Sequence, residues 1–296
     1  MMSFPPLKDL IAQDIALSHA EQGSLMGIVF LSSVFFSRAL GTFVDRRGCK
    51  FSGLLGIGIM FAGALLAAFD SYPVMLAGRF VLGFGGILSS LVAIKSIAMF
   101  FPNNRRGVLM GLFHSVFPLA SILAFGTFRN LGENLGWQLV VLGLALSLLP
   151  VMLLFYRFFP TTEHKPPEEA QKSTRTSFPL SFWALLVIWS LFGFTGAIIN
   201  TFGSAFLNET GLDPIEADRA MVWLMIGVVP ATPLLGWLLD KWKQPGRLLL
   251  LSSLLSATLL GLIAKGIGDP VFLMPLYGIA LSGIPVGVFM IASIQT

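Results

Sequence analysis

The sequence is poor in the residues that build disulfides, metal sites and charged surfaces. It has one cysteine, Cys49, which excludes a disulfide within the chain. Its three histidines, at positions 19, 114 and 164, do not have the spacing of a zinc site. Only 11% of the 296 residues are charged. Redox and metal chemistry are therefore unsupported.

Groupings of catalytic residues are also missing. The chain has no G-x-x-x-x-G-K-[ST] sequence, so nothing indicates a phosphate-binding loop or ATP-driven chemistry. Serine, histidine and aspartate all occur, but no acid stands near His114 in the same apolar run to orient it as a base. We expect neither an enzyme nor a bound cofactor.

Apolar residues dominate the chain. They make up 55% of it, and the mean hydropathy is +0.82, more apolar surface than a soluble core of this size can hide. Runs of roughly 20 apolar residues without in-out alternation predict membrane-spanning helices and exclude barrel strands. We expect an all-α integral membrane protein with nine helices, near 24–44, 51–69, 73–100, 107–128, 137–158, 181–206, 219–239, 247–266 and 270–293.

The basic residues lie mainly on one side of these helices. Twelve lysines and arginines fall in loops on one side and four on the other, a strong bias that predicts the richer side to be cytoplasmic. The net charge of +4 is thus explained by membrane orientation rather than by nucleic-acid binding. The polar stretch 159–180, rich in Pro, Glu, Lys and Ser, predicts a cytoplasmic linker between two helix bundles, and the C-terminus is placed on the same side.

The two halves of the chain repeat each other at an offset of 195 residues. Gly41, Asp45 and Arg46 correspond to Gly236, Asp240 and Lys241. Before the preceding helices, Ser18 with Glu21 resembles a capping box, and Asp213 with Pro214 and Glu216 supplies a similar helix start. Two related bundles are predicted.

The repeat also predicts which helices are present. Shifting the helix at 181–206 back by 195 residues places most of its counterpart before Met1, and two helices are expected after the last one. The chain then corresponds to helices two to ten of twelve: an N-terminal bundle at 1–158 with its first helix largely missing, and a C-terminal bundle at 181–296 lacking its last two helices. The alternative is a genuine nine-helix protein.

The charged turn at 41–50 matches a family signature. It fits every position of G-x-x-x-D-[RK]-x-G-x-[RK], through Gly41, Asp45, Arg46, Gly48 and Lys50. On these residues the chain resembles the major facilitator superfamily, whose fold is two six-helix bundles. The resemblance implies that this turn is a gating latch, with the aspartate engaging the opposite bundle; the alternative is an ordinary charged anchor at the membrane edge. The degenerate copy is Gly236, Asp240 and Lys241.

The resemblance covers essentially the whole chain. RFVLGFGG, from Arg79 to Gly86, resembles the family's fourth helix, and Gly83 shifted by 195 residues falls on Gly278. Two departures stand out. The fifth helix has Phe117-Pro118 in place of the glycine-proline signature of drug exporters, and Gln138 stands where many members carry arginine.

Charged residues inside the apolar runs are all basic in this interpretation, because each of the fifteen acidic residues falls in a loop, a tail or a helix end. Buried charges are costly and usually face a bundle interior or an aqueous path. A basic interior favours an anionic solute. The candidates for substrate binding are Arg79, His114, Asn200, Lys95 and Arg38.

Each candidate also has a purely structural interpretation. Arg38 and Lys95 lie close enough to helix ends for their side chains to reach the membrane surface. Arg79 serves equally well as a hydrogen-bonding residue in a helix contact. His114 is a candidate proton carrier because histidine side chains ordinarily titrate near neutral pH, but a lone histidine in a helix is more often a packing residue. Asn200 can bridge helices instead of binding a polar substrate.

Together these features predict a secondary transporter that moves a small solute, an organic or inorganic anion, by alternating access in a plasma or inner membrane. Proton coupling, as in a symporter, is implied by the resemblance to the family, although we expect no carboxylate deep in an apolar run. The alternative is a truncated, non-transporting member that acts as a scaffold subunit.

Overall fold

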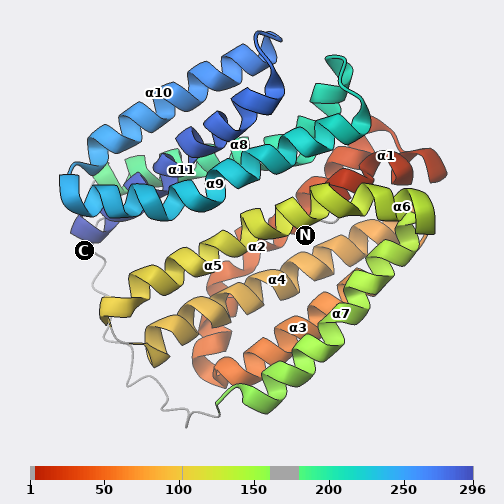
Figure 1. Cartoon of the computed structure of the whole chain (residues 1–296). Coiled ribbons are helices and arrows are strands. Elements are labelled where there is room, and N and C mark those ends of the chain that lie inside the picture. Colours follow the sequence, from red (N-terminus) through yellow and green to blue (C-terminus); the bar gives the residue numbers. More distant parts are fainter. Residues whose placement is uncertain (1–3, 102, 161–179, 296) are drawn as a thin grey trace. The chain divides into compact units, whose positions relative to one another are not determined.

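The computed structural model describes residues 4–101, 103–160 and 180–295, and these form helices joined by short turns (Figure 1). All nine predicted helices are present. Eight of the described helices are long and apolar enough to cross a membrane, α5 not being among them. The helices are α1 (Phe4–Asp14), α2 (His19–Arg47), α3 (Cys49–Leu66), α4 (Tyr72–Phe100), α5 (Asn103–Leu123), α6 (Arg129–Leu135), α7 (Trp137–Phe158), α8 (Leu180–Glu209), α9 (Pro214–Trp242), α10 (Pro245–Ala264) and α11 (Pro270–Gln295).

The helix boundaries follow the 195-residue repeat. Both α2 and α9 contain 29 residues and begin and end 195 positions apart. Ser18 caps α2 in a complete capping box with Glu21, and Asp213 caps α9 by accepting from the amides of Ile215 and Glu216. These caps lengthen both helices beyond the predicted 24–44 and 219–239, because polar first turns are invisible to a hydropathy pattern.

The chain clusters into two compact units. Unit 1 comprises the described parts of Met1–Met110 and Phe128–Thr174, and unit 2 those of Gly111–Thr127 and Arg175–Thr296. The second half of α5 thus packs with unit 2, although the predicted first bundle at 1–158 included all of it. The predicted linker at 159–180 falls almost wholly outside the described residues, so that boundary stays a prediction.

Unit 1 is built on α4. This helix packs against α2 and α3, and α3 in turn packs against α7 (Figure 1). One apolar cluster joins α1, α2 and α7 through Phe4, Leu25 and Trp137. A second lies where α2, α3 and α4 meet, around Val44, Cys49 and Leu88.

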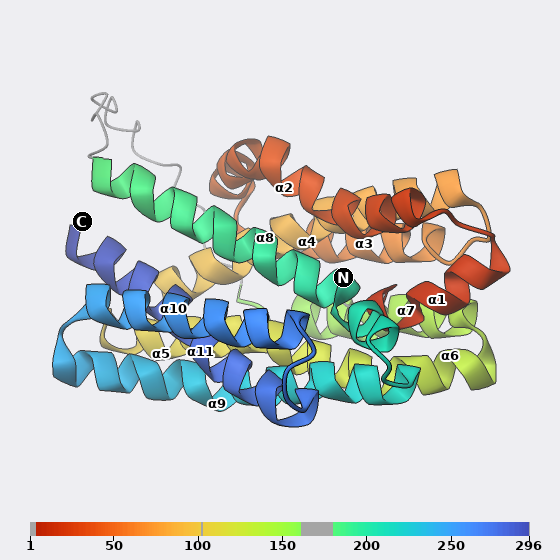
Figure 2. The ribbon, with the colours of Figure 1, turned by 90° about the horizontal axis from the view of Figure 1, so that it is seen from above.

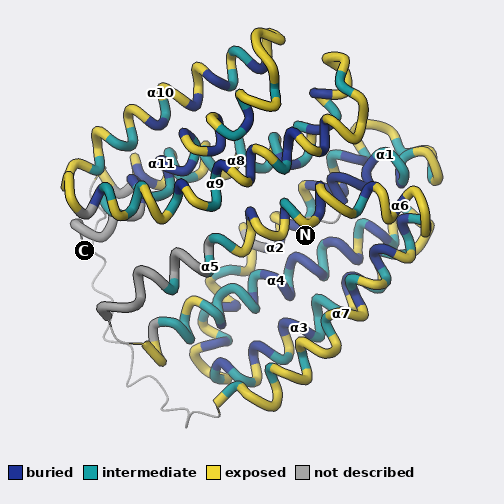
Figure 3. Tube along the Cα trace, viewed as in Figure 1, coloured by how far each residue is buried: buried dark blue, intermediate teal, exposed yellow. Residues whose placement is uncertain are grey.

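Unit 2 is built on α11, which lies between α9 and α10 in both ribbon views (Figure 2). Its main cluster includes Leu224, Met274 and Tyr277, with Ile122 of α5 packed against it. Helix α10 buries only a narrow stripe, at Ser252, Ser256, Leu259 and Ile263, and is exposed along much of its length (Figure 3). Such an exposed apolar face suits a lipid environment.

Matching glycines bring helices together in the two units. A Cβ on Gly83 of α4 would collide with the backbone oxygen of Val29 in α2. A Cβ on Gly278 of α11 would collide with the backbone oxygen of Leu224 in α9. Both partners of the second contact lie 195 residues after those of the first. Small residues allow such close backbone contact between membrane helices.

The predicted helix at 107–128 is interrupted. After α5, which contains Pro118, Ala124–Phe128 form a π-helix (η1) that leads directly into α6. A π-helical turn adds a residue without breaking the helix, and apolar periodicity does not reveal it. One of the boundaries between the two units, after Thr127, falls within this element.

Candidate functional site

The charged turn at 41–50 joins α2 to α3. Gly48 has a φ of 80°, a left-handed conformation that glycine adopts without strain. Asp45, near the end of α2, accepts a hydrogen bond from Lys95 Nζ of α4 at 2.6 Å. Lys50 Nζ lies 5.5 Å from the ring centroid of Tyr156 on α7. Arg46 is exposed.

Both partners of this ion pair belong to unit 1. The resemblance implied that Asp45 engages the opposite bundle, so the pair with Lys95 is an interaction that the motif did not predict. It also gives Lys95, a predicted substrate-binding residue, an acidic partner near the end of α2. The gating role of the turn remains a proposal.

The second copy of the turn has a different environment. Gly236 lies in α9, and a Cβ there would meet no atom within 4 Å. Lys241 Nζ lies 3.8 Å from the ring centroid of Trp237. The helix ends at Trp242, and Lys243 follows in a left-handed conformation with a φ of 52°. The side chain of Asp240 lies outside the described residues.

Among the predicted site residues whose side chains the structure describes, Arg79 is the most deeply buried, with 2% of its surface exposed. Its guanidinium carbon lies 4.0 Å from the ring centroid of Phe4 in α1, and its Nε donates to the backbone oxygen of Leu25 in α2. These contacts supply a cation–π interaction and a hydrogen bond that offset the cost of burial. Arg79 thus ties α4 to α1 and α2.

Two other predicted residues lie on α2 and α5. Arg38 lies exposed on α2. His114 lies on α5, and its side chain falls outside the described residues.

Unit 2 contains a polar cluster between α8 and α9. Asn200 is buried; its Nδ2 donates to the backbone oxygen of Gly196 at 2.8 Å, while its Oδ1 has no hydrogen-bond partner among the described residues. One turn later, the hydroxyl of Ser204 donates to Oδ1 of Asp218. Both Ser204 and Asp218 are buried.

Asp218 corrects the expectation that the interior holds no acidic group. The prediction began the helix at 219 and so placed Asp218 outside it. Because Asp213 caps α9 and Pro214 begins it, Asp218 is the fifth helical residue and faces α8. The sequence indicates a helix start at Asp213 and Pro214, and this start could have predicted that Asp218 lies within the helix.

A second polar network lies where α1, α6 and α7 meet in unit 1. Asp14 accepts from Trp137 Nε1 and from Gln138 Nε2, each at 3.0 Å. Gln138 Nε2 also donates to Asp70 at 2.9 Å. The departure at Gln138 is therefore accommodated, since its neutral amide joins two carboxylates that an arginine would pair by charge. Nearby, Arg129 pairs with Asp9 at 3.1 Å.

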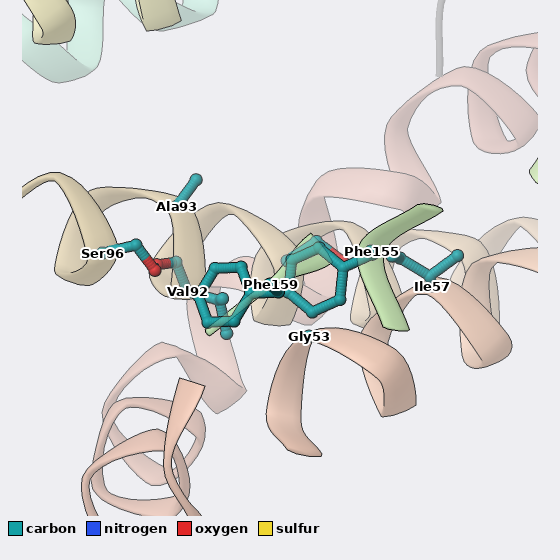
Figure 4. A pocket seen from close by; sticks show the side chains of 8 residues that line it. Gly53, Ile57, Val92, Ala93, Ser96, Phe155 and Phe159 are labelled. Carbon is teal, nitrogen blue, oxygen red and sulfur yellow. The ribbon is translucent and has the colours of Figure 1, made fainter. Parts of the chain in front are cut away.

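A cavity of about 240 Å³ lies among α3, α4 and α7 (Figure 4). Its walls include Gly53 and Ile57 of α3 and Val92 of α4. They also include the rings of Phe155 in α7 and of Phe159 immediately after this helix, which stack with centroids 4.4 Å apart. None of the predicted substrate-binding residues whose side chains are described lines it. Within the described ranges, no group of three or more His, Cys, Asp or Glu side chains could hold a metal ion.

Comparison with known proteins agrees with this architecture. The chain is 28% identical over 261 residues to the 3-(3-hydroxy-phenyl)propionate transporter of Escherichia coli (strain K12), covering 85% of this chain and 64% of that protein. It is 30% identical over 149 residues to polyol transporter 5 of Arabidopsis thaliana, covering 49% and 27%. The chain thus spans less than two thirds of the length of these relatives.

Solved structures share the fold. A bacterial homolog of the human lysosomal transporter Spinster, in an inward-facing and unoccupied conformation, matches with a TM-score of 0.70 at 17% identity, covering 99% of this chain and 70% of that one. A D-xylose-proton symporter matches with a TM-score of 0.63 at 16% identity, covering 99% and 82%. The relatives are named as transporters, in agreement with the prediction that the chain is not an enzyme. The sequence profile of the Major Facilitator Superfamily matches residues 1–296, so the chain belongs to this family of multi-pass membrane proteins.

Proposed function

We propose that this protein is part or all of a secondary transporter that moves a small solute by alternating access. The observation that carries this proposal is the match of the whole chain to the Major Facilitator Superfamily. The repeated helix contacts at Gly83 and Gly278 support it, because transporters of this kind are built from repeats that rock about a central site.

The proposed substrate is a small organic anion. The E. coli relative is named for 3-(3-hydroxy-phenyl)propionate, which carries a carboxylate and an aromatic ring. Arg79 is a buried cation whose guanidinium has five N–H donors in all and already stacks on the Phe4 ring. Arginine pairs well with carboxylates, so an aromatic acid matches the chemistry available at this position.

A neutral polyol is the second candidate. The Arabidopsis relative is named for polyols, and Asn200 carries a buried oxygen without a hydrogen-bond partner. A hydroxyl-rich solute could satisfy such an acceptor. The two candidates differ in charge and can therefore be separated by competition.

The charged turn serves as the gate in this proposal. The ion pair of Asp45 with Lys95 is partly exposed, so it can break and reform at a small cost as the protein changes state. The bias of basic residues supports the further proposal that this turn, the linker and the C-terminus lie on the cytoplasmic side of a cell membrane.

The test is uptake by the purified full chain in proteoliposomes, with radiolabelled 3-(3-hydroxyphenyl)propionate as the probe. We expect uptake above that of protein-free vesicles and competition by the unlabelled acid. The amide of the same compound, matched in shape but neutral, should compete weakly. Competition by a polyol instead of the acid would favour the second candidate, and the absence of uptake of either solute would contradict the proposal.

A further inference from the structure

The cavity among α3, α4 and α7 lies at the end of unit 1 that carries the charged turn. Gly53 and Ile57 lie in the first half of α3, and Phe155 lies in the last turn of α7. At a rise of about 1.5 Å per residue, Gly53 and Ile57 are roughly 6 and 12 Å from the start of α3. Since the charged turn is expected at the membrane surface, the cavity lies at the depth where lipid acyl chains begin.

The interior of this cavity suits an apolar ligand. Its two serine hydroxyls already donate within the protein, Ser96 to the backbone oxygen of Val92 at 2.6 Å and Ser89 to Sδ of Met60 at 3.7 Å. The volume of about 240 Å³ exceeds the roughly 150 Å³ that holds a benzene molecule in an apolar protein interior. The cavity therefore has room for a segment of a hydrocarbon chain.

The cavity opens between α4 and the end of α7. Its floor at Gly53, Ile57 and Val92 is buried, whereas its rim at Ser96 and Phe159 is half-buried (Figure 4). A ligand can therefore enter from the side of the helix bundle, without passing through the bundle interior.

Lys50 lies at one edge of this cavity. It precedes Gly53 by three residues in α3, which places the two on the same side of the helix. Its Nζ lies 5.5 Å from the ring centroid of Tyr156, the residue after Phe155. Tyr156 is exposed near the end of α7, a position typical of aromatic residues at the membrane–water interface. An ammonium group has three N–H donors, so it can bind a phosphate in addition to its present contacts.

The charged turn as a whole favours an anion. Arg46 and Arg47 are exposed, and Asp45, the one acid of the turn, pairs with Lys95 at 2.6 Å. The turn thus presents a surplus of positive charge beside the opening of an apolar cavity. An anionic phospholipid carries both matching parts, a phosphate and acyl chains. Such lipids give the cytoplasmic leaflet its negative potential, and this turn is proposed to face that leaflet.

We propose that this end of unit 1 binds an anionic phospholipid, with one acyl chain in the cavity among α3, α4 and α7 and the phosphate at Lys50. The chain buries its methylene groups against Ile57, Val92 and the stacked rings of Phe155 and Phe159. The inference does not depend on which solute the protein transports.

The first test is native mass spectrometry of the purified full chain with phosphatidylglycerol, compared with zwitterionic phosphatidylcholine that has the same acyl chains. Phosphatidylglycerol should bind about fivefold more tightly, and Lys50→Gln should abolish this preference. Arg157→Gln removes the same charge from the exposed end of α7 and is the matched control, which should keep the preference.

Three outcomes of this first test would overturn the proposal. They are equal binding of the two lipids by the wild type, a preference that survives in Lys50→Gln, and an equal loss in Lys50→Gln and Arg157→Gln. The last would show a general attraction of the lipid to surface charge instead of a site at Lys50.

The second test fills the cavity. Ser96→Phe places a ring in it from the rim and should weaken phosphatidylglycerol binding about tenfold or more, because the acyl chain loses the apolar surface that it buries. Ile94→Phe, at an exposed position of the same helix, is the control. Should Ser96→Phe not fold, Ala93→Leu fills the cavity by a smaller amount and should still weaken binding. Unchanged binding in a folded cavity variant contradicts the site.

Photolabelling locates the acyl chain in the wild type. Phosphatidylglycerol with a diazirine on one acyl chain should label peptides that contain Val92 or Phe155, and unlabelled phosphatidylglycerol should suppress this labelling. Labelling confined to other helices would place the lipid elsewhere and overturn the proposal.

Discussion

Units 1 and 2 have the same helix contact but opposite buried charges. The Gly83 contact with Val29 and the Gly278 contact with Leu224 occupy equivalent positions. Unit 1 buries the cation Arg79, whereas unit 2 buries the acid Asp218. The positions matching these two residues at the 195-residue offset are Met274 and Gly23. The two units therefore share the close glycine contact between their helices but differ in the charged residues that they bury.

The charged turns differ in the same way. In unit 1, Asp45 pairs with Lys95. The residue matching Lys95 in unit 2 is Met290, and Lys241 lies instead on the ring of Trp237. Among the side chains that the structure describes in the two turns, the ion pair belongs to the first turn.

The largest effect is expected from adding a methyl group at the two close glycine contacts that the units share. Gly83→Ala and Gly278→Ala should each lower the free energy of unfolding by about 1–3 kcal/mol, because the added Cβ meets backbone that cannot rotate away. Gly58→Ala is the control, since a Cβ there meets no atom within 4 Å. Thermal unfolding in detergent measures all three. If Gly278→Ala destabilises the protein and Gly83→Ala does not, the two glycine contacts are not equivalent in the two units.

The next largest effect is expected from replacing Arg79 with methionine, the residue at the matching position 274 of unit 2. Arg79→Met should leave the protein level nearly unchanged, because methionine adapts to irregular apolar space and Met274 is buried at the matching position in unit 2. Uptake of 3-(3-hydroxyphenyl)propionate should fall about tenfold or more through loss of an anion partner. Arg157→Met, at an exposed position outside the predicted site, is the control. Unchanged uptake would remove Arg79 from the mechanism.

The ion pair at the charged turn should have a smaller effect on stability. Asp45→Asn and Lys95→Met, the latter introducing the residue of unit 2, should each cost at most about 1 kcal/mol, because both partners are partly exposed. A double-mutant cycle measured by thermal unfolding gives the coupling between them. Asp45→Asn should also slow turnover in the uptake assay, and normal turnover would argue against a latch.

The smallest expected effect concerns Gln138 in the polar network of unit 1. Gln138→Arg restores the basic residue common in the family between Asp14 and Asp70, and should stabilise the protein by a few tenths of a kcal/mol, as for other exposed ion pairs. Gln138→Leu should destabilise it by leaving both carboxylates with fewer donors. Thermal unfolding at low and high salt measures the difference, and a gain that persists at high salt would exclude an ionic cause.

Much of the fold could be predicted from local properties of the chain. Apolar runs predicted all nine long helices, the caps at Ser18 and Asp213 marked two helix starts, and the 195-residue offset paired Gly83 with Gly278 before any contact was known. These features depend on helix geometry and on neighbouring residues, so the sequence by itself determined them.

Only the tertiary structure decided which polar groups are buried and with which partners. Asp218 lies near a helix end and resembles a surface residue until α8 packs over it. Lys95 resembled an interior cation until α2 brought Asp45 to it, and Arg79 gained Phe4 from a helix 75 residues earlier in the chain. The second half of α5 joined unit 2 in the same manner. Burial and charge pairing depend on residues that are far apart in the chain. Hydropathy averages only over neighbouring residues, so it cannot predict these contacts.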